Sequence, residues 1–229
     1  MPMLKASLMF ALSLVTAFST LGQATPDHNA GWRLFAKSEG VEIFRREVPG
    51  SSIIALKGKG VIEAPLWKLA AILLDTERAP EWVDSLGESR MVRRLSPYSY
   101  IEYNHIRTPF IMRDREFVSL VQIEVDPKGK RFALHYRPLE GSAEVAPSSK
   151  VRGQIVSGAF VLGALSERTT LLDAELHCDP MGSVPKWIIN FFQSDWPKDT
   201  FQALRIQSTK PDIRIPSDFG SILQATVDF

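Results

Sequence analysis

The stretch from Thr169 to Asn190 reads TTLLDAELHCDPMGSVPKWIIN and joins a strand pattern to a helix pattern. Residues 170–178 form a short run typical of a β-strand, and the segment from Asp179 to Ser183 is rich in turn residues. From Val184 the apolar residues fall at helical spacing, and Ser183 is placed to cap the helix. The stretch therefore predicts a strand that leads through a short loop into an amphipathic helix.

The predicted helix has one apolar face, which carries Val184, Trp187, Ile188, Phe191 and Phe192. Pro197 is expected to kink it, and the helix is expected to resume through Phe201 and Leu204. Residues 209–229 show no clear period.

Upstream, the chain reads as a hairpin, two short helices and a series of strands. Gly58 and Gly60 lie inside the second hairpin strand, where glycine usually marks a bend or bulge. The hairpin covers 41–48 and 53–62, the helices 66–74 and 78–84, and the further strands 90–95, 100–107, 116–125, 131–136, 151–162 and 170–178. Short turns between successive strands predict antiparallel pairing.

This order predicts an α+β protein with a curved antiparallel sheet wrapped around a long C-terminal helix. Such a sheet is wider than one helix of about 10–12 Å diameter, so part of its inner face should line an internal hydrophobic cavity. Alternation predicts that the inner face carries Phe117, Val121, Ile123, Val156 and Phe160.

The residues from His177 to Asn190 resemble the entry into the final helix of START domains, the steroidogenic-acute-regulatory-protein-related lipid transfer family. A second resemblance is Arg115-Glu116-Phe117-Val118, which is similar to the family's Arg-Asp-Phe-Val, and a weaker one is Glu39-Gly40-Val41. The resemblance covers about Trp32 to Ile206. It implies a helix-grip fold whose cavity holds one lipid, with no metal or coenzyme.

The resemblance also suggests polar ligand contacts on the strand at 100–107. Glu102 stands where some sterol-binding members carry an acid, but the position expected for its basic partner is Val121. His105 and Arg107 are alternative contacts for a polar head group, on the face opposite Glu102. The sequence leaves open which face points inward.

Several residues of this strand and of the motifs around it have more than one possible role. His105, near Tyr103 and Glu102, is either an acid–base group, a ligand contact or a structural histidine. Arg107 is either a rim or a pocket residue, and Arg115 is expected to pair with a carboxylate near the sheet. The expected ligand-binding residues are thus Glu102, Tyr103, His105, Arg107, Phe117, Val121, Trp187, Ile188, Phe191 and Phe192.

The segment from Thr108 to Arg113 places apolar residues in a loop between two strands, at the expected mouth of the cavity. These residues either pack beneath the loop or form a gate that meets a membrane during lipid exchange. The gate consists of Phe110, Ile111 and Met112, with Arg113 available to an anionic head group.

Composition and motifs exclude several function classes. The 27 basic and 26 acidic residues nearly cancel, and no basic stripe points to nucleic acid. With one cysteine, Cys178, neither an internal disulfide nor a zinc-thiolate set is possible. The sequence contains no common catalytic motif, and His177 and Cys178 are expected to point to opposite faces of a strand.

The N-terminus has the layout of a secretory signal. After Lys5 the chain is apolar or small from Ala6 to Leu21, which is shorter than the roughly 20 apolar residues of a membrane helix. Cleavage is expected after Ala24, with an uncleaved anchor as the alternative. The scarcity of cysteine favours a bacterial periplasm.

The sequence thus predicts a signal peptide at 1–24, a lipid-binding domain at 30–207 and a C-terminal tail at 208–229. The leading hypothesis is a monomeric, non-enzymatic carrier that binds one lipid or other hydrophobic ligand and contacts membranes transiently. The alternatives are an enzyme of the same superfamily that acts on a hydrophobic substrate, and a ligand-sensing module.

Overall fold

The computed structural model describes residues 31–108, 112–139, 144–146, 148–184, 189 and 194–227. Its strands are β1 (Arg33–Ser38), β2 (Val41–Arg46), β3 (Ala55–Ile62), β4 (Leu86–Ser96), β5 (Ser99–Ile106), β6 (Arg115–Asp126), β7 (Arg131–Pro138), β8 (Val151–Arg152), β9 (Gln154–Ser166) and β10 (Thr169–Asp179). Its α-helices are α1 (Leu66–Leu74), α3 (Trp196–Ser208) and α4 (Gly220–Val227), and short 3-10 helices are η1 (Thr76–Glu81) and η2 (Ser217–Phe219).

The described strands form one sheet in the order β1-β2-β3-β10-β9-β7-β6-β5-β4. Neighbours in this order are antiparallel, as the short turns predict, and β8 pairs in parallel with β6. Strand β1 is not predicted from the sequence. This edge strand is largely exposed, so it lacks the apolar alternation that would identify it.

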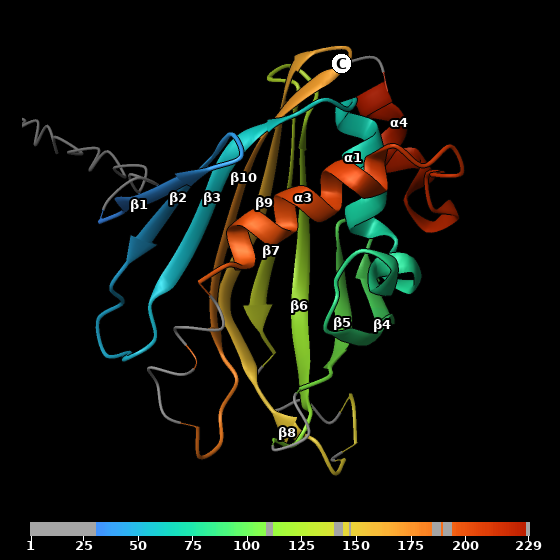
Figure 1. The fold of residues 1–229 in the computed structure, drawn as a ribbon. Coiled ribbons are helices and arrows are strands. Elements are labelled where there is room, and N and C mark those ends of the chain that lie inside the picture. Colours follow the sequence, from blue (N-terminus) through green and yellow to red (C-terminus); the bar gives the residue numbers. More distant parts are fainter. Residues whose placement is uncertain are drawn as a thin grey trace, which may run out of the picture. The chain divides into compact units, whose positions relative to one another are not determined.

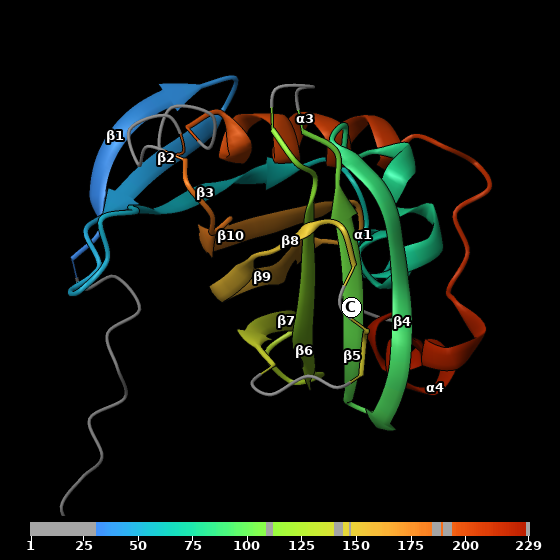
Figure 2. The same cartoon turned by 90° about the horizontal axis from the view of Figure 1, so that it is seen from below.

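The sheet curves, and α3 lies along its open side (Figures 1 and 2). Close packing of α3 on β3 depends on Gly58 and Gly60. A Cβ at Gly58 would lie 2.9 Å from the Phe201 ring, and one at Gly60 would lie 2.8 Å from the Gly40 carbonyl oxygen. The register of β3 with β2 and β10 is regular here, so the glycines mark no bulge, and they allow close contact between helix and strand.

Pro197 does not kink a helix, contrary to the sequence prediction. It lies in the first turn of α3, which begins at Trp196. Proline is well tolerated there because its missing N–H would have no intrahelical acceptor. The helix then buries Phe201 and Leu204 against the sheet.

Helix α1 has the bounds that the sequence predicts, and the core continues from it into the C-terminal segment. Leu69, Ala70 and Ala71 of α1 are fully buried, because this helix packs against α3, α4 and β9. The expected tail contributes Ile213, Phe219, Ile222 and Leu223 to the same core. These four side chains anchor the segment in the core.

Strand β9 has a bulge that interrupts its alternation, and this displaces Val156 from the inner face. The register passes from His177 opposite Ser157 to Cys178 opposite Ile155, which leaves Val156 as the extra residue of a β-bulge. Ile155 then faces inward, and Val156 is 39% exposed instead of lining the inner face. The other predicted inner residues, from Phe117 to Phe160, are buried or half-buried on the inner face.

Candidate functional site: an internal cavity

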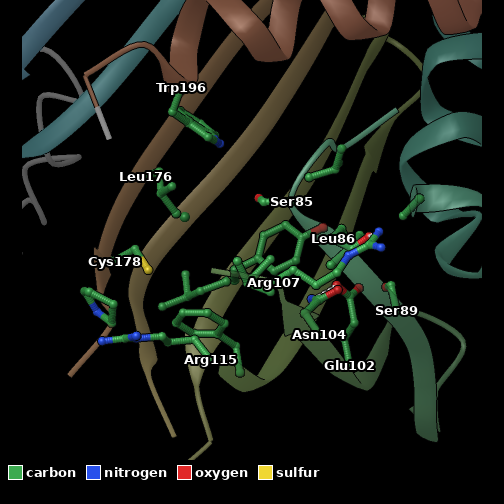
Figure 3. A pocket seen from close by; sticks show the side chains of 18 of the residues that line it. Ser85, Leu86, Ser89, Glu102, Asn104, Arg107, Arg115, Leu176, Cys178 and Trp196 are labelled. Atoms are coloured by element: carbon green, nitrogen blue, oxygen red, sulfur yellow. Dashed lines mark hydrogen bonds between the residues drawn. The ribbon is translucent and has the colours of Figure 1, made fainter. Parts of the chain in front are cut away.

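A cavity of about 500 Å³ lies between the inner face of the sheet and the helices (Figure 3). Its wall is mostly apolar, with a few polar groups. It is lined by Leu73, Thr76, Ala79, Trp82, Val83, Ser85, Leu86, Ser89, Glu102, Asn104, Ile106, Arg107, Thr108, Met112, Arg115, Phe117, Tyr136, Ile155, Gly158, Phe160, Glu175, Leu176, Cys178, Pro180, Val184, Ile189 and Trp196. This size and character suit a small hydrophobic molecule.

Strand β5 turns its even-numbered residues toward the cavity. Glu102, Asn104 and Ile106 line the wall, so the open question of which face points inward is resolved in favour of Glu102. Tyr103 and His105 therefore do not line the cavity, contrary to expectation. The Tyr103 ring packs with Ile101 and Val118 on the outer face, and His105 Nε2 lies 2.7 Å from an Asp114 carboxyl oxygen.

Arg107 lies at the rim of the cavity. Alternation would place it beside His105, but β5 ends at Ile106 and the chain leaves the strand. The backbone N–H of Arg107 donates to the Ser85 carbonyl oxygen at 2.7 Å, and its Nη2 donates to the Leu86 carbonyl oxygen at 3.0 Å. The side chain is exposed and still borders the cavity. Arg107 is therefore a rim residue that also forms part of the pocket.

Glu102 is a buried acid without a basic partner among the described residues. Burial raises the pKa of Glu102 to about 7, and the Asn104 amide, which donates to Oε1 at 2.5 Å, opposes this shift. The Tyr100 hydroxyl also lowers this pKa, although the two groups do not meet the geometry of a hydrogen bond. The carboxyl is therefore about half protonated near pH 7, where an ordinary glutamate is ionised.

The Glu102 carboxyl is part of a polar spot in the apolar wall. Within the described part of the chain, Glu102 Oε2, Tyr100 Oη and Ser119 Oγ are buried and have no hydrogen-bond partner. Ser119 is the direct cross-strand neighbour of Glu102. Val121, the position of the missing basic partner, is fully buried in the core opposite Tyr100 and does not line the cavity.

Aromatic and sulfur-containing side chains complete the wall on the opposite strands. Phe160 packs edge-on against Tyr136 at 6.2 Å and against Trp196 at 6.3 Å between ring centroids. Burial raises the pKa of the Cys178 thiol to about 12, so this thiol stays protonated. His177 points to the other face, where its Nε2 lies 3.2 Å from Ser51 Oγ, which agrees with the alternation of the strand.

Sequence reasoning missed several of these wall residues. Asn104 follows from alternation once Glu102 is known to face inward. Trp196 and Tyr136 carried no usable signal, because an aromatic residue beside a proline or within a strand is usual in any core.

Arg115 does not pair with a carboxylate among the described residues, contrary to expectation. Its side chain is 5% exposed and lines the cavity. Its Nη1 donates to the carbonyl oxygen of Arg113.

Part of the expected site falls outside the described residues. This holds for Trp187, Ile188, Phe191 and Phe192 of the predicted lid helix and for Phe110 and Ile111 of the predicted gate. Of the remaining gate residues, Met112 lines the cavity, and Arg113 is exposed and donates from Nε to the Ser149 carbonyl oxygen at 3.0 Å.

Among the described residues, no group of three or more His, Cys, Asp or Glu side chains is arranged to hold a metal ion. None of the helices in this part of the chain is long and apolar enough to cross a membrane.

Comparison with known proteins gives a family match over most of the chain. The model of the START domain matches residues 14–196. An uncharacterized protein of Pseudomonas aeruginosa is 23% identical over 209 residues, which cover 90% of this chain and all of that protein.

Solved structures share the fold. Human StAR-related lipid transfer protein 5 aligns with a TM-score of 0.73 at 16% identity, over 80% of this chain and 88% of that one. A STAR-related lipid transfer protein from Xanthomonas axonopodis aligns with a TM-score of 0.69 at 20% identity, over 79% of this chain and 99% of that one. The predicted helix-grip fold is thereby confirmed.

Proposed function

The chain belongs to the START domain family, whose fold implies the binding of a lipid or other hydrophobic ligand, and from this premise we propose that it carries one such molecule between membranes. The observation that carries the proposal is the mostly apolar cavity of about 500 Å³ behind α3. Burial of hydrocarbon contributes about 0.8 kcal/mol per CH₂ group, so such a site binds tightly without any catalytic group.

We propose that the cargo leaves the protein chemically unchanged. Glu102 has a raised pKa that would suit an acid catalyst, but the cavity-lining Cys178 thiol is held protonated and is a poor nucleophile. Glu102 then serves as a polar contact for the bound molecule or for ordered water. This is consistent with its own Oε2, which has no hydrogen-bond partner among the described residues, and with the unpartnered Tyr100 Oη and Ser119 Oγ.

Export and membrane contact complete the proposal. The apolar N-terminal run supports a signal peptide that is cleaved near Ala24 and delivers the protein to the periplasm. The apolar gate at 110–112, with Met112 on the cavity wall, supports brief contact with a bilayer while the cargo enters or leaves.

The test fills the cavity without touching its mouth. Leu176 lies on the wall in Figure 3, and Leu176→Trp places a larger side chain in the space that the cargo would use. The matched control is Leu165→Trp, because Leu165 is 60% exposed at the other end of the sheet. Transfer of a fluorescent lipid between donor and acceptor vesicles is measured for the wild type and both variants.

We expect Leu176→Trp to lose most of the transfer activity while its circular dichroism spectrum is retained, and Leu165→Trp to transfer like the wild type. Unchanged transfer by a folded Leu176→Trp protein would contradict carriage inside this cavity.

A further inference from the structure

Arg115, at the start of β6, is a buried cation on the cavity wall. Its side chain is 5% exposed, and its Nε–H is sealed from solvent and has no hydrogen-bond partner among the described residues. The guanidinium has five N–H groups, and in the described part of the chain one hydrogen bond is seen, from Nη1 to the Arg113 carbonyl oxygen. An arginine keeps its charge at any physiological pH, so burial cannot be relieved by loss of a proton.

The acidic groups nearest to Arg115 in the chain are engaged elsewhere. Asp114 bonds with His105 at 2.7 Å and accepts the Thr108 N–H at 3.0 Å. Glu116 points to the outer face, where Arg152 Nη2 donates to it at 2.8 Å. Across the described residues, no carboxylate forms an ion pair with Arg115. A buried cation without a counter-charge is costly, and a partner that supplies the charge stabilises it strongly.

The Arg115 charge lies beside the apolar part of the cavity and away from the polar groups around Glu102. Arg115 pairs with Ile106, and Glu102 pairs with Ser119, so the two groups are four residues apart along the inner face. Figure 3 shows Arg115 on the side of Cys178 and Glu102 on the opposite side of the pocket. Phe117 lines the wall two residues beyond Arg115. A molecule that satisfies Arg115 must therefore join a negative group to an apolar body.

We propose that Arg115 binds the oxyanion head, a carboxylate or a phosphate, of an amphiphile whose hydrocarbon part fills the cavity. The planar guanidinium offers parallel N–H groups that match two oxygens of either head. This inference rests on the proposed function and specifies the class of cargo.

The test compares three ligands with the same hydrocarbon chain. Hexadecanoate, hexadecyl phosphate and hexadecanol each displace a fluorescent lipid from the purified, delipidated protein. In the wild type, both anions should bind at least about tenfold more tightly than the alcohol. Arg115→Gln should remove this preference while its affinity for hexadecanol stays within about twofold of the wild type. The control Arg137→Gln removes the same charge from an exposed position on β7 and should leave all three affinities unchanged.

The outcomes separate this inference from the proposed function. A preference for either anion that depends on Arg115 supports the inference and identifies the head group. Equal binding of alcohol and anions by the wild type contradicts the inference and leaves carriage intact, whereas no binding of any of the three contradicts the proposed function. Arg115→Gln weakening all three ligands alike would show a structural arginine and also contradict the inference. If Arg115→Gln does not fold, Arg115→Lys replaces it and should keep a reduced preference for anions, because the charge remains without the planar fork.

Discussion

At the scale of single residues, the most unusual group besides Arg115 is Glu102. It is a carboxyl that the fold holds in an apolar wall, and burial raises its pKa from 4.5 to about 7. Folded protein therefore keeps the proton to higher pH than unfolded protein. The stability associated with the neutral carboxyl is complete below about pH 4.5 and is lost as the pH rises toward 7.

Glu102→Gln should remove this pH dependence, because the amide has nearly the same shape and cannot ionise. The free energy of unfolding of the wild type, relative to the variant, should fall by about 3 kcal/mol between low pH and pH 8, mostly between pH 4.5 and 7. Urea denaturation of both proteins over this range measures the difference. A difference that is constant with pH would contradict a buried, neutral Glu102.

The inward face of β5 could not be predicted from the sequence, and the reason is physical. Glu102 faces the cavity, but Tyr103 and its neighbours Ile101 and Val118 are also buried, because Leu139 and Val145 cover the outer face. Both faces of this strand are therefore covered, and each carries apolar and polar residues, so alternation carries no direction. Along β9, the predicted inner residue that alternation misplaced is Val156, at the bulge opposite His177 and Cys178.

At the scale of elements, the fit between α3 and β3 sets how closely the helix covers the sheet. Phe201 is fully buried against Gly58 and Gly60, and any side chain at Gly58 would meet its ring and Pro197. The absence of side chains at these two glycines therefore allows α3 to pack closely on β3.

Gly58→Val should destabilise the protein by about 1–3 kcal/mol, because the added methyl groups push α3 away from β3. The control is Gly163→Val in β9, where an added Cβ meets nothing within 4 Å and valine suits a strand. Thermal unfolding of both variants is measured, and the double variant Gly58→Val with Phe201→Ala should lose less than the sum of the two single changes. Equal stability of Gly58→Val and Gly163→Val would contradict the close packing of α3 on β3 at Gly58.

At the scale of the whole molecule, the described domain is completed by its C-terminal segment. The Phe219 ring packs at a tilt against the Tyr100 ring, with 5.6 Å between the ring centroids, and Ile222 and Leu223 of α4 are buried in the main core. The sequence did not reveal this, because α4 has eight residues and follows two prolines, which leaves too short a span for a helical period. The family match also ends at residue 196, before this segment.

Deletion of residues 210–229 should therefore destabilise the domain strongly. Each of the four buried apolar side chains, those of Ile213, Phe219, Ile222 and Leu223, contributes roughly 1.5–3 kcal/mol on burial, and their loss also exposes α1. The melting temperature of the truncated protein is compared with that of the full chain. A truncated protein that melts like the full chain would show that the segment is dispensable.

The main features of the fold follow from local patterns, whereas the details of the site do not. The helix at Leu66–Leu74 and the antiparallel strands rest on periodicity and turn residues, which act over a few neighbours. The polar groups that distinguish this cavity, Arg115 and Asn104 among them, depend on which strands meet and what covers them. Only the assembled sheet decides that.

The measurement that tests the central claim most directly is native mass spectrometry of the protein purified from its own compartment, without detergent. Carriage of one amphiphile in the cavity predicts a complex of one chain with one lipid, which is lost in Leu176→Trp and retained in Leu165→Trp. A bare chain that stays bare after incubation with the lipid extract of the same cells would contradict the account.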